Sequence, residues 1–82
     1  MTIKVIVKFI SIYAEKLGKE RIIELEDNAT VEDLLEKLTK EIEALGIDIK
    51  PVVFVNYRFT KDKQVLRDGD EVLVMPPFAG GS

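Results

Sequence analysis

The chain has 82 residues, of which 46% are hydrophobic and 33% charged, with a formal net charge of −3 and no cysteine or histidine. This length and balance predict one small globular domain without disulfides, thiol chemistry, the usual zinc sites or triad-type catalysis. The acidic charge argues against nucleic acid, and the apolar runs fall far below the roughly 20 residues that span a membrane. We therefore predict a cytoplasmic protein with no metal and no bound cofactor.

The N-terminal third predicts two paired strands joined by a short helical turn. Residues 2–10 alternate as a strand does, and one face of that strand is wholly apolar. That face carries Ile3, Val5, Val7 and Phe9. Residues 11–19 form the connector, in which one helical turn ends at Gly18. Residues 21–26 are the second strand, which we expect to lie antiparallel to the first.

A helix over residues 31–45 is the clearest predicted element. Thr30 has the side chain of an N-cap, and Asp33 stands where a capping partner is needed. Six apolar residues recur at helical spacing on one stripe: Val31, Leu34, Leu35, Leu38, Ile42 and Leu45. Gly46 ends the helix. An apolar stripe of this kind must be covered, so the helix is expected to lie across a sheet.

The C-terminal half predicts three further strands. Residues 52–55 form a continuous apolar strand, a short edge segment surrounds Phe59, and an Asp-Gly-Asp turn precedes the last strand at residues 71–75. The fold class is therefore α+β, a mixed four- to five-stranded sheet with one main helix across one face. One helix leaves the other sheet face open, where Ile6, Leu73 and Met75 form an apolar surface suited to a partner.

The last seven residues have a composition unlike the rest of the chain. Pro76 and Pro77 cannot extend a strand ladder, and Phe78 is the one large side chain before a run of small residues. We predict a folded domain over residues 1–76 and a flexible diglycine tail over residues 77–82. The predicted partner interface comprises Ile6, Leu73, Met75, Pro76, Pro77, Phe78 and Ala79.

Several segments together resemble a known family. They are Tyr-Ala-Glu-Lys-Leu-Gly at residues 13–18, Ala-Thr-Val-Glu-Asp-Leu at 29–34, Val55-Asn56, Leu-Arg-Asp-Gly-Asp-Glu-Val at 66–72 and Pro-Pro-Phe-Ala-Gly-Gly at 76–81. Taken in this order, they resemble the MoaD/ThiS family of ubiquitin-like (β-grasp) sulfur carriers, and most of all its molybdopterin branch, the small subunits of molybdopterin synthase. The resemblance spans almost the whole chain.

The resemblance implies a β-grasp fold and a mechanism centred on Gly80 and Gly81. In this family an E1-like enzyme uses ATP in trans to adenylate the C-terminal glycine carboxylate, and sulfur then replaces AMP. The resulting thiocarboxylate donates sulfur in the large catalytic subunit of molybdopterin synthase, within a heterotetramer. The small subunit itself is not catalytic. Two alternatives remain: a ubiquitin-like modifier conjugated through Gly81 to target lysines, and a sulfur carrier for tRNA thiolation or thiamin.

The sequence departs from the family pattern at its last residue. Active members end at the second glycine, whereas Ser82 follows Gly81 here. With Ser82 attached, Gly81 has a peptide carbonyl in place of a carboxylate that can be adenylated. Three explanations stay open: removal by a protease, a residue added by cloning, or a blocked relative.

Overall fold

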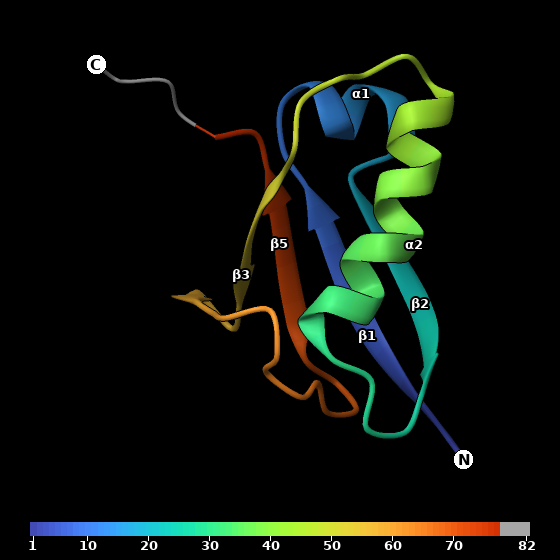
Figure 1. The fold of residues 1–82 in the computed structure, drawn as a ribbon, viewed down its shortest axis with the longest axis vertical. Helices are drawn as coiled ribbons and strands as arrows, with labels where there is room; N and C mark the ends of the chain where they lie inside the picture. The colour runs from blue at the N-terminus through green and yellow to red at the C-terminus, as the bar shows by residue number, and fades with distance from the viewer. Residues whose placement is uncertain (78–82) are drawn as a thin grey trace.

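The computed structural model describes residues 1–77, so that residues 78–82 of the predicted tail lie outside it. Its elements are β1 (Thr2–Phe9), α1 (Ile12–Leu17), β2 (Glu20–Glu26), α2 (Val31–Ala44), β3 (Val52–Val55), β4 (Arg58–Phe59) and β5 (Glu71–Met75). The strands form one sheet in the order β2-β1-β5-β3-β4. β1 and β5 are parallel and all other neighbours antiparallel, and α2 crosses one face (Figure 1). The predicted α+β class with a mixed sheet is confirmed.

The core lies between α2 and the sheet face that it covers. The alternating residues Ile3, Val5, Val7 and Phe9 of β1 are buried, as predicted, and so are Val72 and Val74 of β5. The predicted cap of α2 is present as a full capping box. The Asp33 amide donates to the Thr30 hydroxyl oxygen (3.3 Å), and the Asp33 carboxylate accepts from the Thr30 amide (2.9 Å). Local polar chemistry therefore starts the helix where its buried stripe begins.

The predicted apolar stripe of the helix extended one turn too far, because it included Leu45. Leu45 is 45% exposed, because α2 ends at Ala44 and Leu45 is the C-cap residue. Gly46 then turns the chain with φ of 82°. Ile47 follows it into the core at 7% exposure, and its amide donates to the Ile42 carbonyl (3.2 Å). Ile47, rather than Leu45, completes the buried surface at this end of the helix.

Side-chain hydrogen bonds fix the turn that leads into β5. The Asp70 carboxylate accepts from the Arg67 amide (2.8 Å) and from the Asn56 side-chain amide (3.0 Å). The Asn56 side-chain carbonyl in turn accepts from the Glu71 amide (3.0 Å). Asp68 accepts from the Lys4 amide (2.8 Å), which ties the same turn to β1. Asp68 and Asp70 thus have structural roles in setting where β5 begins.

Asp70→Ala is expected to destabilise the domain by about 2–3 kcal/mol, because backbone and side-chain donors lose a charged acceptor. Chemical unfolding monitored by circular dichroism measures this change. Asp48→Ala, at an exposed position outside this turn, is the matched control and should shift the free energy of unfolding by less than about 0.5 kcal/mol. Equal effects of the two substitutions would show that the turn contributes little to stability.

Candidate functional site

The last strand lies in the middle of the sheet and carries the chain toward the predicted tail. β5 is bordered by β1 on one side and β3 on the other, with Val74 opposite Phe9 and Met75 opposite Val52. The ladder stops at Met75, because the two residues that follow are prolines and have no amide hydrogen. The chain therefore leaves the sheet at its centre, at one end of β5 (Figure 1).

The structure places five of the predicted interface residues. Ile6, Leu73 and Met75 are half-buried on the sheet face opposite α2, called the open face below, while Pro76 is half-buried and Pro77 exposed. The other predicted site residues, Phe78, Ala79, Gly80 and Gly81, lie outside the described residues.

Further apolar side chains, which sequence analysis did not assign to the interface, extend this surface. Strand register puts Phe54 beside Leu73 and Phe59 beside Phe54. The two phenylalanine rings meet edge to face with centroids 5.8 Å apart, and Phe59 is 72% exposed. Together with the predicted residues they make an apolar area, the open-face patch: Ile6, Val52, Phe54, Phe59, Leu73 and Met75. Exposed aromatic groups of this kind are typical of protein-binding surfaces.

An ion pair interrupts the open-face patch. The Lys8 ammonium lies 3.2 Å from the Glu71 carboxylate, and both side chains are partly exposed. Hydrogen bonds from the Tyr57 hydroxyl and from Lys8 lower the pKa of the Glu71 carboxyl. The hydrogen bond to Glu71 and its negative charge raise the pKa of the Lys8 ammonium, and the same carboxylate raises the pKa of Tyr57. The three groups therefore form one polar cluster, charged on Lys8 and Glu71 at neutral pH.

The pH dependence of stability should report this cluster. Because the pKa of Glu71 is lowered from 4.5, its contribution is present above that value and is lost as the pH falls through the folded-state pKa. The pKa of Lys8 is raised from 10.5, so its contribution is lost only above that value. We expect Glu71→Gln to lower the melting temperature at about pH 7, with the difference shrinking at about pH 3. Glu36→Gln, at an exposed position on α2, is the control for a change of charge away from the cluster.

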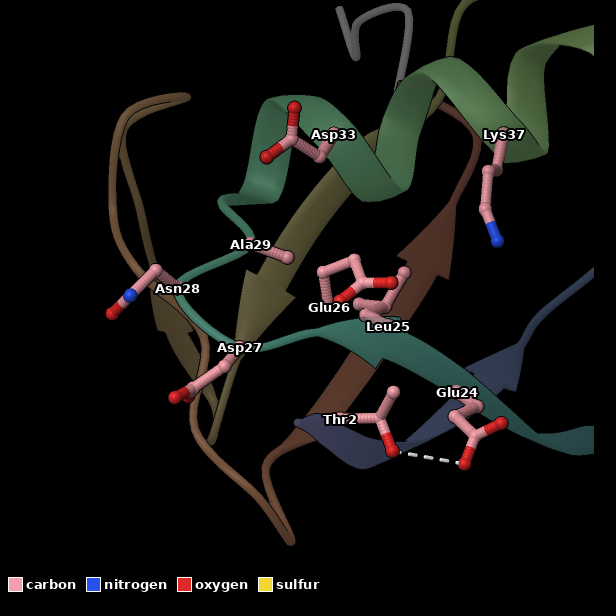
Figure 2. A pocket seen from close by; sticks show the side chains of 9 residues that line it. All are labelled: Thr2, Glu24, Leu25, Glu26, Asp27, Asn28, Ala29, Asp33 and Lys37. Carbon is pink, nitrogen blue, oxygen red and sulfur yellow. Dashed lines mark hydrogen bonds between the residues drawn. The ribbon is translucent and has the colours of Figure 1, made fainter.

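A pocket of about 470 Å³ lies at the opposite end of the sheet from Met75, between β2 and the start of α2 (Figures 1 and 2). Its lining includes four carboxylates, Glu24, Glu26, Asp27 and Asp33. Thr2 donates to Glu24 (3.0 Å) and Asp33 caps α2, so two of them serve the local structure. Among residues 1–77, no group of three or more acidic, histidine or cysteine side chains is arranged to hold a metal ion. This pocket therefore carries no identifiable chemistry.

The described part of the chain also contains no helix that is both long and apolar enough to cross a membrane. The fold and the exit of the chain from the centre of the sheet define a β-grasp domain of the ubiquitin-like class. An archaeal ubiquitin from Caldiarchaeum subterraneum has the same fold, with a TM-score of 0.65 at 20% identity over 99% of this chain and all of the other.

The chain belongs to the ThiS family, whose model matches residues 7–81 and so includes both tail glycines. A molybdopterin synthase sulfur carrier subunit from Chlamydomonas reinhardtii is 42% identical over 65 residues, which is 76% of this chain and 78% of that protein. Among solved structures, molybdopterin converting factor subunit 1 from Pyrococcus furiosus is similar with a TM-score of 0.81. Its identity is 31%, over 93% of this chain and 99% of the other. Small archaeal modifier protein 1 of Haloferax volcanii is less similar, with a TM-score of 0.76 at 23% identity over 93% and 99% of the two chains.

Proposed function

We propose that this protein is the sulfur carrier subunit of a molybdopterin synthase and supplies sulfur for the molybdenum cofactor. The observation that carries the proposal is the 42% identity to a molybdopterin synthase sulfur carrier subunit over most of both chains. The family match through residue 81 and the similarity to a molybdopterin converting factor support it. The modifier alternative has weaker support, since the modifier structure above shares 23% identity with this chain.

The chemistry that we propose takes place at the carboxylate of Gly81. A carboxylate oxygen attacks the α-phosphorus of ATP, pyrophosphate leaves, and an acyl-adenylate forms. A sulfide donor then attacks the acyl carbon, the C–O bond to AMP breaks, and a thiocarboxylate remains. Glycine suits both steps because no Cβ obstructs a narrow active site and the backbone adopts angles closed to other residues. The chain has no histidine or cysteine, so we assign the acid and base groups to the partners.

Two partners follow from this proposal: an E1-like enzyme that binds ATP, and a large catalytic subunit with which the carrier forms a heterotetramer in the cytoplasm. The open-face patch and Pro76-Pro77 are the surfaces that we assign to docking. Burying apolar area of this kind supplies most of the favourable energy of protein association. Once the domain has docked, the tail starts at one end of that contact, since Met75 of the patch is the last residue of β5.

A mass measurement tests the proposal. A chain ending at Gly81 and the chain ending at Ser82 are each incubated with the cognate E1-like enzyme, ATP and sulfide, and then weighed. We expect the first to gain the mass difference between a sulfur and an oxygen atom, and the second to remain unchanged because its Gly81 carbonyl is a peptide bond. Failure of the Gly81-ending chain to change would contradict the proposal.

The same samples separate the alternatives. Higher-mass conjugates of the Gly81-ending chain in cell extract would favour the protein modifier. A thiocarboxylate that restores thiolated tRNA or thiamin, but forms no molybdopterin with the cognate large subunit, would move the protein to those branches of sulfur transfer.

A further inference from the structure

The Lys8–Glu71 ion pair lies among the apolar side chains of the proposed docking surface. In the register of β1 and β5, Ile6 stands opposite Glu71 and Lys8 opposite Leu73. Lys8 and Glu71 therefore lie diagonally across the two strands, with their charged groups 3.2 Å apart, and Ile6 and Leu73 lie on either side of them. A partner that covers Ile6 and Leu73 also covers the charged pair between them.

The ion pair leaves Lys8 with hydrogen-bond donors that Glu71 does not use. The Glu71 carboxylate lies 3.2 Å from the Lys8 ammonium, and the Tyr57 hydroxyl also lowers the pKa of its carboxyl. The Lys8 ammonium has three N–H donors, one of which is directed at Glu71. With side-chain exposures of 39% for Lys8 and 25% for Glu71, water still reaches both groups in the isolated domain. Docking removes that water, and the remaining Lys8 donors then need acceptors on the partner.

Tyr57 is the third member of this cluster. It occupies the turn between β3 and β4 with φ of 67°, in the left-handed region that favours glycine. Its side chain is 75% exposed. Asn56 before it has φ of 51°, so the two residues form the tight turn with two positive φ angles that β-hairpins favour. The Tyr57 hydroxyl lies close enough to Glu71 for that carboxylate to raise the pKa of Tyr57.

The neighbouring strand limits the kind of acceptor that fits. Glu20 lies opposite Lys8 on β2, and Glu24, opposite Lys4, lies further along the same exposed face. A further carboxylate from a partner would be repelled by Glu71 and by these acids. An uncharged oxygen, such as a backbone or amide carbonyl, meets no such repulsion, and a cationic rim facing β2 would complement the acids.

We propose that the Lys8–Glu71–Tyr57 cluster is a specificity element of the open face. It selects a partner surface with an apolar centre, an uncharged carbonyl acceptor opposite Lys8 and basic side chains facing β2, and it rejects surfaces that are apolar throughout. The inference rests on the proposed function, in which the large subunit of the synthase is the occupant of this face.

Calorimetric titration of the cognate large subunit with Gly81-ending carriers tests the inference. Lys8→Met should weaken binding by at least about tenfold, and Lys8→Arg, which keeps the donors, should stay within about threefold of wild type. The double variant Lys8→Glu/Glu71→Lys should keep an intrachain ion pair and a near-wild-type melting temperature. It should nevertheless bind as weakly as Lys8→Met, because donor and acceptor have changed places. Lys4→Met, on the same strand and face, is the matched control and should have less than about a twofold effect.

The outcomes separate the two proposals. The specificity element would be overturned if the wild-type carrier bound and Lys8→Met bound equally well or more tightly. It would also be overturned if the exchanged pair recovered full binding. In both cases the proposed carrier function would stand. Comparable losses in Lys4→Met would also overturn the specificity element, since general surface charge would then explain the effect. If the wild-type carrier did not bind the large subunit at all, the proposed function would fail, and this inference with it.

Discussion

Gly81→Ala, in a chain that ends at residue 81, is expected to lower sulfur transfer by at least about 100-fold. In the proposed function the reacting carbon has to reach an active site in another protein, and a methyl group on the neighbouring carbon would displace it from the geometry that the reaction requires. ATP–pyrophosphate exchange with the E1-like enzyme measures the adenylation step, and thiocarboxylate mass measures the product.

The melting temperature distinguishes this chemical effect from a structural one. The folded domain is held by contacts within residues 1–77, so Gly81→Ala and deletion of Gly80-Gly81 should each leave the melting temperature within about 1 °C of wild type. A drop of several degrees would mean that the glycines stabilise the fold, and the carrier interpretation of the tail would then be wrong.

Leu38→Ala should have the largest effect on stability of the substitutions proposed for this protein, at about 2–5 kcal/mol. Leu38 is fully buried at the middle of α2, and truncation leaves a cavity between the helix and the sheet. A domain of this size has about 5–10 kcal/mol in total, so the variant loses a large part of its stability. Urea denaturation provides the measurement.

Leu45→Ala is the matched control for Leu38→Ala, because it removes the same atoms from a residue just past the end of the same helix. Leu45 is 45% exposed, so we expect a change below about 1 kcal/mol. Equal losses for the two variants would show that Leu45 packs in solution, as the helical spacing of the sequence predicted.

Local patterns were sufficient to predict most of the secondary structure. Alternation along residues 2–9 defined the buried face of β1, and the Thr30–Asp33 pair located the start of α2, because both signals depend on neighbours in sequence. The prediction for Leu45 was wrong because tertiary packing, and not the local helical spacing, decides which residue is buried at the end of α2. Helical spacing continued through Leu45, but the chain gains more by turning at Gly46 and burying Ile47.

The candidate site was predicted less completely, for a different physical reason. Alternation along β5 and the need for one uncovered sheet face were enough to place Leu73 and Met75 on the open face. The Lys8–Glu71 pair and the Phe54–Phe59 contact depend on strand register, and register between β1 and β5 joins opposite ends of the sequence. The roles of Gly80 and Gly81 came from the family resemblance alone, and these residues lie outside the described structure.

The central position of β5 has a consequence for synthesis of the protein in the cell. The ribosome makes β1 first, yet the parallel partner of β1 is the last strand to emerge. A nascent chain that stops before residue 75 lacks the middle of its sheet, exposes Val5 and Val7 to water, and becomes a substrate for proteases. Folded copies are therefore those in which translation has already passed β5, so products that stop earlier do not accumulate as folded domains.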